Sequence, residues 1–232
     1  MRFIFKTEYN QDITLAKHGG HVFWYSLLAI FLVVAPWAVP EYWLAQLTFV
    51  LIYAVVGLGL MLLAGFTGLF SLGHAAFLGV GAYTQAVMVN AGVPFPLALV
   101  CAGVFSAMAG VIVGLPALRV KGIYLGMATL AFGFIVEEGM ARWESVTGGN
   151  AGLMVTYPKL GGWTLDSTEE FYFLCLLVTV GATLAIVNLL RSSTGRAFVA
   201  IRDSEISAQS MGIHLARYKT LLVALSAALA GI

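Results

Sequence analysis

Residues that could do chemistry are few in this chain, and many of them gather near its C-terminal end. Five of the 12 Lys and Arg residues lie within residues 191–219, together with Asp203 and Glu205. Charged side chains interleaved with hydroxyls suit the recognition of another surface through ion pairs and hydrogen bonds. The stretch separates two long apolar runs and is too long for a simple turn. We therefore expect it to be a docking surface for a second protein.

Sequence motifs for catalysis are absent. No Lys follows a Gly anywhere, so the chain has no G-x-x-x-x-G-K-[ST] loop to bind the phosphates of ATP. There is no H-E-x-x-H motif, and the four histidines are scattered along the chain. The sequence therefore predicts a protein that is not an enzyme and that binds no cofactor, metal or nucleic acid itself.

The elements that must position the docking segment are apolar helices. The chain is 60% hydrophobic and 10% charged, whereas soluble domains have about 25% charged residues. Several apolar runs approach the roughly 20 residues that a helix needs to cross a bilayer, and they are continuous rather than alternating as in a barrel. We predict an all-α transmembrane bundle of about six complete spans plus a partial seventh. The expected spans are 22–39, 44–64, 69–90, 95–115, 122–141 and 171–190, with a seventh starting near 217.

The last apolar run is short. From Arg217 to Ile232 it could extend about 24 Å as a helix, which is less than the roughly 30 Å of a hydrocarbon core. We therefore expect the chain to be a fragment, or a protein that has lost its C-terminal spans.

The distribution of basic residues predicts the orientation in the membrane. With the N-terminus in the cytoplasm, ten of the 12 Lys and Arg residues fall on the cytoplasmic side, as the positive-inside rule requires. They are Arg2, Lys6, Lys17, Arg119, Lys121, Arg191, Arg196, Arg202, Arg217 and Lys219. The expected organisation is a cytoplasmic segment over 1–21 and a permease domain over 22–232. The latter contains a periplasmic loop at 142–170 and a cytoplasmic loop at 191–217.

One cytoplasmic connection lacks the expected basic residues. Residues 64–74 read AGFTGLFSLGH and carry no formal charge apart from His74 when it is protonated. Their glycines interrupt a helix, and irregular backbone at membrane depth is tolerated only inside protein or beside a water-filled cavity. Two interpretations remain open: a broken or re-entrant segment, or a tight helical hairpin with glycines for packing. The candidate path or gate residues here are Gly65, Thr67, Gly68, Ser71, Gly73 and His74.

The adjacent acids Glu137 and Glu138 lie about 24 Å along the fifth span from Lys121, near the outer interface. Either they end the helix in water, or one of them faces an outward-open vestibule. Glycines within the spans, such as Gly110 and Gly114, fit close helix approach.

The docking segment itself reads as two short helices. Thr194 is expected to cap the first, over 195–202, and Asp203 or Ser204 to cap the second. Gly212 suits the position after the end of the second helix. Apolar contacts for the second helix are expected from Ile206, Met211 and Ile213. From the residues alone, the segment is either a knob that docks a protein or an amphipathic helix lying on anionic lipid.

Four sequence blocks resemble the permeases of branched-chain amino-acid ABC transporters, in the order that the family has them. They are GFTGLFSLGHAAFLGVGAY at 65–83, KGIYLGMATLAF at 121–132, TGGNAGL at 147–153 and STGRAFVAIR at 193–202. They are most similar to the second permease subunit, the LivM type. Residues 207–212 also resemble the Ala-Ala-x-x-x-Gly loop by which ABC importer permeases engage their ATPases. However, Ile206 stands where that loop usually has Glu.

The resemblance implies a permease subunit of an importer in the bacterial inner membrane. Its implied partners are a homologous second permease, two cytoplasmic ATPases that bind ATP and Mg, a periplasmic substrate-binding protein and membrane lipid. The ATPase-coupling candidates are Arg196, Arg202, Asp203, Ser207, Ala208 and Gly212. Further path candidates are Thr129 and Phe132, with core packing as the other role for Phe132. The candidate outer vestibule residues are Glu137, Thr147, Gly148 and Gly149.

The resemblance leaves the cargo open among branched-chain amino acids, other amino acids, urea, amides and aromatic acids. Two other classes of function also remain. An ion-coupled secondary carrier would transport without ATPases, and a membrane scaffold or sensor would leave uptake intact when deleted.

Overall fold

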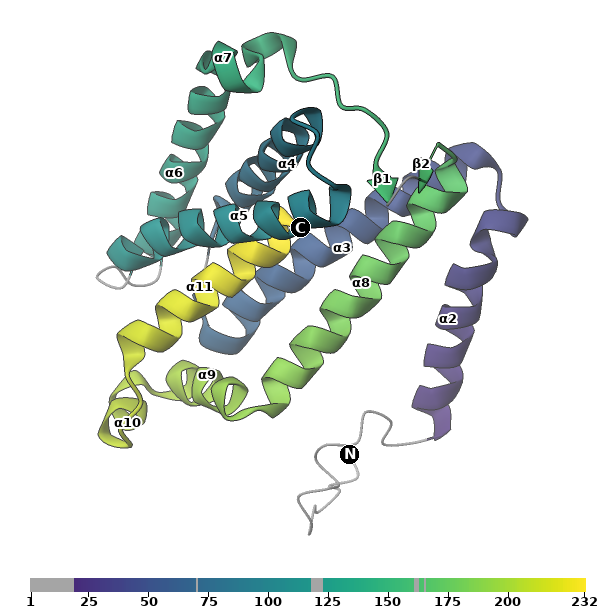
Figure 1. The fold of residues 1–232 in the computed structure, drawn as a ribbon. Helices are drawn as coiled ribbons and strands as arrows, with labels where there is room; N and C mark the ends of the chain where they lie inside the picture. The colour runs from purple at the N-terminus through teal and green to yellow at the C-terminus, as the bar shows by residue number, and fades with distance from the viewer. Residues whose placement is uncertain (1–18, 70, 118–122, 161–162, 165) are drawn as a thin grey trace.

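The protein is a bundle of long helices with two short helices at one end (Figure 1). The computed structural model describes residues 19–69, 71–117, 123–160, 163–164 and 166–232. Its longer helices are α2 (Gly19–Ala38), α3 (Glu41–Thr67), α4 (His74–Asn90), α5 (Phe95–Ala117), α6 (Ile123–Arg142), α8 (Thr168–Arg191) and α11 (Leu215–Gly231). The two short helices are α9 (Ser193–Asp203) and α10 (Glu205–Ser210). The all-α membrane bundle predicted from the sequence is confirmed.

The long connection between α6 and α8 has structure of its own. It contains α7 (Glu144–Thr147), the 3-10 turn η1 (Gly149–Ala151) and two paired strands of two residues each, β1 (Lys159–Leu160) and β2 (Trp163–Thr164). The strands pair antiparallel, with Lys159 opposite Thr164. This hairpin is an addition to the all-α prediction.

Each predicted span falls on one of the long helices, but their lengths differ. Among the described residues, three helices are long and apolar enough to cross a membrane, and a fourth apolar helix is shorter. The three are Glu41–Thr67, Phe95–Leu115 and Thr168–Arg191, and the shorter one is Val22–Ala38. The number of crossings therefore stays a prediction. Of the expected N-terminal segment, residues 1–18 lie outside the described residues, as do Arg119 and Lys121.

Successive helices run in opposite directions, so the connections alternate between two ends of the bundle (Figure 1). One end carries α9 and α10 together with the connection from α3 to α4, and we call it the α9–α10 end. The other carries α7 and the two strands, and we call it the hairpin end. This alternation places the segments 64–74 and 191–217 at the same end, as the charge distribution predicts.

Helix α11 lies in the middle of the bundle and packs against α3, α4 and α5. Glycines on the neighbouring helices leave room for it, because they have no Cβ. A Cβ at Gly110 would lie 2.6 Å from the Ala227 Cβ, and one at Gly114 would lie 3.4 Å from the Val223 Cβ. The close approach predicted for Gly110 and Gly114 is therefore confirmed, with α11 as the partner helix.

The break between α3 and α4 spans only residues 68–73. Helix α3 ends where Gly68 adopts a φ of 67°, a left-handed conformation that favours glycine. The two helices do not pack along their lengths: both pack on α11, and they approach each other at Gly59 and His74. The interpretation of 64–74 as a tight helical hairpin is therefore wrong, and the broken segment packed among helices is what the structure has.

The core consists of three clusters. Near the α9–α10 end, Leu62, Leu63, Ile186, Phe198, Leu222 and Val223 join α3, α8, α9 and α11. Ala35, Leu44, Leu51 and Tyr172 join α2, α3 and α8. Phe77, Ala227 and Ala230 join α4 and α11. The first cluster fixes the position of α9 and so bears directly on the candidate site.

The contact between α4 and α11 gives a test of this packing. A Cβ at Gly81 would lie 2.3 Å from the Gly231 Cα, and neither backbone can move aside cheaply. We expect Gly81→Ala to lower the free energy of unfolding by about 1–3 kcal/mol, as for other overpacked sites. Thermal unfolding of the purified protein in detergent measures this. Gly57→Ala is the matched control, because nothing lies within 4 Å of a Cβ there. Equal stability of the two variants would contradict the packing.

Candidate functional site

The α9–α10 segment is fixed firmly to the bundle. In α9, the side chains of Ala197, Phe198 and Ile201 are buried, and the Phe198 ring meets Tyr218 of α11 edge to face at 6.2 Å. The apolar face of α9 is therefore used in packing against the protein. That face of α9 is not available to lie on lipid. For α10 both alternatives, contact with a protein and contact with lipid, remain predictions, because Ile206 and Met211 are exposed.

Serines begin both short helices. The Ser192 hydroxyl accepts a hydrogen bond from the Gly195 backbone, so Ser192 caps α9 and the cap expected at Thr194 is wrong. Ser204 caps α10 by accepting from the Ser207 backbone N–H at 3.3 Å, which is one of the two alternatives predicted. Gly212 follows the helix end with a φ of 84°, as predicted. These caps satisfy backbone N–H groups that helix starts leave free.

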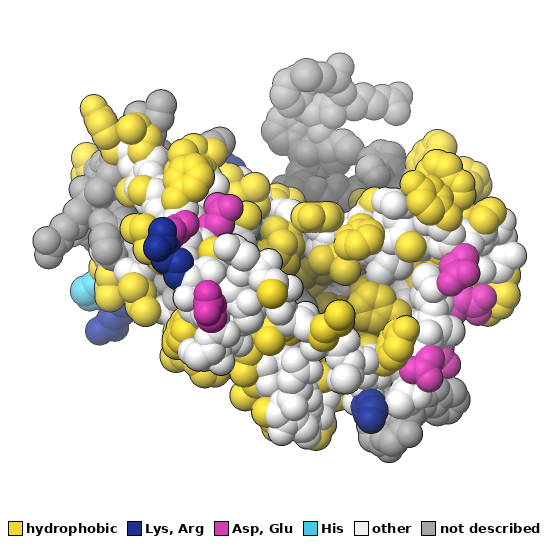
Figure 2. All heavy atoms as spheres, turned by 90° about the horizontal axis from the view of Figure 1, so that it is seen from above, with side chains coloured by type: hydrophobic (Ala, Val, Ile, Leu, Met, Phe, Trp, Pro, Cys, Tyr) yellow, Lys and Arg dark blue, Asp and Glu magenta, His cyan; other side chains and the backbone are white. Residues whose placement is uncertain are grey.

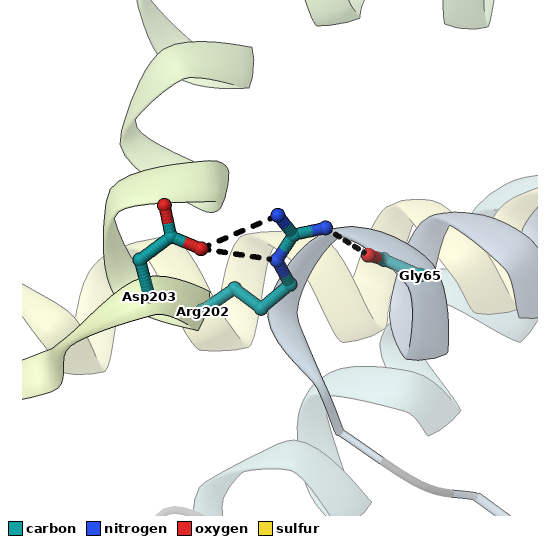
Figure 3. A network of polar contacts seen from close by, with 3 residues as sticks. All are labelled: Gly65, Arg202 and Asp203. Atoms are coloured by element: carbon teal, nitrogen blue, oxygen red, sulfur yellow. Dashed lines mark hydrogen bonds and ion pairs between the residues drawn. The ribbon is translucent and has the colours of Figure 1, made fainter. Parts of the chain in front are cut away.

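Arg202 connects the end of α9 to the end of α3 (Figure 3). Its Nη1 donates to the Gly65 carbonyl oxygen at 3.0 Å. Its Nε and Nη2 both approach Asp203 Oδ1 at 3.3 Å. The guanidinium thus bridges the docking segment and the connection from α3 to α4, and it does so at the surface, where the Arg202 side chain is 46% exposed.

The six predicted coupling residues do not all reach the surface. Arg196, Arg202, Asp203, Ser207 and Gly212 are exposed, whereas Ala208 is buried. The Ala208 side chain lies on the buried side of α10 and cannot contact a partner without a rearrangement. Two residues that were expected to make internal apolar contacts, Ile206 and Met211, are instead 84% and 82% exposed.

The exposure of Ile206 and Met211 is the feature that sequence reasoning missed. Helix α10 has a single turn and a half, so it buries only one side, and Ala208 already occupies that side. A signal was present, since Ile206 and Met211 are five residues apart, which places them about 140° apart around a helix, so they cannot both follow Ala208 into the core. The exposed pair forms an apolar tip on α10, and we call it the α10 tip.

The broken segment after α3 meets α6. The Leu72 backbone N–H donates to Thr129 Oγ1 at 3.0 Å, and Thr129 in turn donates to the Gly126 carbonyl. A Cβ at Gly73 would lie 1.8 Å from the Thr129 carbonyl oxygen, so only glycine fits there. Two groups of predicted path residues, far apart in the sequence, are therefore in contact.

The remaining path candidates have separate surroundings. Thr67 donates to the Leu63 carbonyl within α3, and Phe132 lies 5.8 Å from the Phe77 ring, in the packing role. Ser71, just before α4, and His74, its first residue, are buried. Among the described residues, Ser71 Oγ and the His74 ring nitrogens make no hydrogen bond of normal geometry, although His74 approaches the Val56 backbone. Ser71 and Thr129 line a small cavity that is otherwise apolar. Buried polar atoms without partners are costly, which marks this layer as one that could rearrange.

The predicted vestibule residues are not gathered round an open space. Thr147 is buried and its Oγ1 donates to the carbonyls of Met140 and Trp143. Gly148 and Gly149 have φ angles of 70° and 57° and form the turn that follows. Glu137 is exposed on α6. Thr147 and the two glycines thus shape the loop, and these four residues do not line the large groove of the structure.

That groove opens at the hairpin end, between α3, α4, α8 and α11. In the view from this end, hydrophobic side chains line a hollow and acidic side chains lie around it (Figure 2). The residues that line the groove are mostly apolar and include Val56, Leu78 and Leu229. The acidic residues Glu41 and Asp166 also line it. Glu41 accepts a hydrogen bond from Thr168 at 2.9 Å. No sequence pattern predicted this groove, because its walls come from helices that are distant along the chain.

The described residues offer surfaces for binding at three places. Within the described residues, no group of three or more His, Cys, Asp or Glu side chains could hold a metal ion. The two cysteines, Cys101 and Cys175, are free. The three features are the exposed α10 tip, the polar layer around Ser71 and Thr129, and the groove at the hairpin end.

Comparison with known proteins agrees with this arrangement. Residues 42–232 match the model of the family described as "Branched-chain amino acid transport system / permease component". The chain is 34% identical over 209 residues to the high-affinity branched-chain amino acid transport system permease protein LivM of Salmonella typhimurium, and equally to that of Escherichia coli. These matches cover 79% of this chain and 49% of each relative, so the chain spans about half the length of the curated relatives it matches. No solved structure matches it significantly.

The family match covers the helices α3 to α11, including the α9–α10 segment, the broken connection after α3 and the groove. The chain is therefore a member of the branched-chain amino acid transport permease family.

Proposed function

We propose that this chain is a permease subunit of a bacterial ABC importer that carries branched-chain amino acids or related small solutes across the inner membrane. The observation that carries the proposal is the family match over 42–232, which includes every element of the candidate site. The named relatives belong to a branched-chain amino acid transport system. ATP and Mg would be bound by partner subunits.

The orientation proposed is the one that the basic residues favour, with the N-terminus and the α9–α10 end in the cytoplasm. Arg191, Arg196, Arg202 and Arg217 lie at that end. Acidic residues lie at the hairpin end, where Glu41 and Asp166 line the groove. This distribution agrees with the positive-inside rule and would turn the groove towards the periplasm.

The α10 tip is the proposed contact with an ATPase. Large apolar side chains exposed on a cytoplasmic surface mark protein interfaces. Ile206 and Met211 project from a segment that α9 fixes to the bundle, so a force on the tip would reach the membrane helices. The other partners proposed are a second permease, a second ATPase, a periplasmic binding protein and the surrounding lipid.

The solute path is proposed to start in the groove at the hairpin end. From there it would reach the layer formed by Ser71, Gly73, His74 and Thr129, which serves as the gate. The apolar cluster around Leu62 and Leu222 lies near the α9–α10 end, and it would close the path on that side. The arrangement corresponds to a path that is open to the periplasm and closed to the cytoplasm.

The direct test is transport by the reconstituted system. The chain, its second permease, the two ATPases and the binding protein from one organism would be placed in liposomes, and uptake of leucine, urea, an amide and an aromatic acid compared. We expect ATP-dependent uptake of leucine that requires both the ATPases and the binding protein. Uptake without ATPases, driven by an ion gradient, would show a secondary carrier instead.

The α10 tip gives a specific prediction. Ile206→Asp together with Met211→Asp should weaken co-purification of the ATPase at least about tenfold, because each buried apolar anchor of an interface contributes roughly 1–3 kcal/mol. Met154→Asp is the matched control, since Met154 is 94% exposed at the hairpin end. An unchanged yield of bound ATPase in the double variant would exclude the tip as the contact.

The gate layer gives another. Thr129→Val keeps the side-chain shape but leaves the Leu72 N–H without its acceptor, so we expect the free energy of unfolding to fall by about 1–3 kcal/mol. Uptake should fall with it. Thr183→Val should have little effect, because the exposed Thr183 hydroxyl donates only to a carbonyl of its own helix. Thermal unfolding in detergent compares the two variants. Equal melting temperatures would contradict the hydrogen bond from the Leu72 N–H to Thr129.

A further inference from the structure

A buried ion pair joins α10 to the central helix of the bundle. Lys219 Nζ, in the second turn of α11, donates to Glu205 Oε1, in the first turn of α10, at 2.8 Å. The Lys219 side chain is only 8% exposed and that of Glu205 is 34% exposed. The pair is thus unlike the other described ion pairs, Arg202–Asp203 and Arg142–Glu138, whose side chains are 46–80% exposed.

A buried pair constrains geometry more strongly than an exposed one. An exposed ion pair can open and exchange its partner for water at little cost. A buried ammonium has no water to receive it, so separating Lys219 from Glu205 would leave an uncompensated charge. Glu205 can therefore move only if Lys219 and the start of α11 move with it.

The pair is not what holds the docking segment in place. Phe198 and Ile201 of α9, both fully or almost fully buried, already anchor the segment to α3, α8 and α11. The ion pair adds a second contact, which joins α10 directly to α11. A role in positioning can therefore be separated from a role in folding.

Helix α11 carries a displacement from that connection to the centre of the bundle. Ser226 lies seven residues beyond Lys219, about 10 Å along the helix, and its hydroxyl donates to the Gly59 carbonyl of α3 at 2.8 Å. A Cβ at Gly59 would lie 2.7 Å from the Ser226 carbonyl oxygen and 3.2 Å from His74 Nε2. At this point α3 is therefore in close contact both with α11, at Ser226, and with His74, the first residue of α4.

We propose that Lys219 is a positioning residue for transport: through Glu205 it ties α10 to α11, so that displacement of α10 moves α11 against Gly59 of α3, which lies beside His74 in the gate layer. The inference rests on the proposed function, since it requires an ATPase to displace α10. It assigns the transmission to α11 rather than to the surface bridge from Arg202 to Gly65.

The test removes the charges without leaving either one unpaired. In the reconstituted transporter, Lys219→Met combined with Glu205→Gln should leave the melting temperature and the bound ATPase unchanged. Solute taken up per ATP hydrolysed should fall roughly tenfold, within the usual range of coupling between protein sites. The reversed pair, Glu205→Lys with Lys219→Glu, should recover most of that ratio. Glu205→Gln alone should lower the melting temperature by several degrees, because Lys219 then stays buried without its counter-charge.

The exposed pair at the hairpin end is the control. Glu138→Gln removes a carboxylate that meets Arg142 at the surface and should leave the ratio of uptake to hydrolysis unchanged. A neutral Met–Gln variant that binds ATPase and couples as the wild type does would overturn the inference, and so would a reversed pair that assembles but couples no better than the neutral one. If the wild-type chain binds no ATPase or shows no ATP-driven uptake, the proposed function fails, and the inference fails with it.

Discussion

The position of α11 is the constraint on which the rest of the structure depends. Gly59, Gly81 and Gly110 let it approach α3, α4 and α5 at backbone distance, and larger side chains at these positions would push the helices apart. Between membrane helices there is little hydrophobic driving force, so close packing and hydrogen bonds supply the association. The gate layer, the groove and the base of the docking segment all contain residues of α11 or residues packed directly on it.

Polar groups in this bundle are used sparingly and at the contacts between helices. Ser226 donates to Gly59 of α3, and Ser106 of α5 donates to the Phe77 carbonyl of α4 at 2.9 Å. Each hydroxyl donates its hydrogen bond to a backbone carbonyl within a neighbouring helix, so no backbone hydrogen bond of that helix is lost. Ser71 and His74 differ, since their buried polar atoms make no hydrogen bond of normal geometry among the described residues, although His74 approaches the Val56 backbone. A transporter needs one layer with an alternative arrangement, and this layer is where the described packing leaves polar groups unsatisfied.

The two ends of the bundle are built by different means. At the α9–α10 end, the apolar face of α9 is buried while charged and apolar side chains of α10 stay at the surface, so the segment is both anchored and available. At the hairpin end, the groove is open and its acidic lining residues come from α3 and from the residues that precede α8. Two of the three core clusters found among the described residues contain residues of α11, and the largest includes Phe198 of α9.

The sequence by itself determined the helical membrane class, the positions of the long helices, a cap at either Asp203 or Ser204, the turn at Gly212 and the family. Each follows from local pattern, since apolar run length, capping chemistry and left-handed glycine depend on neighbours along the chain. Only the tertiary structure decided that α3 and α4 both pack on α11, that Ala208 is buried while Ile206 is exposed, and that Lys219 meets Glu205. Those outcomes depend on which helices become neighbours in space. The spacing of apolar residues and the composition do not specify the partner of a helix that is apolar on every side.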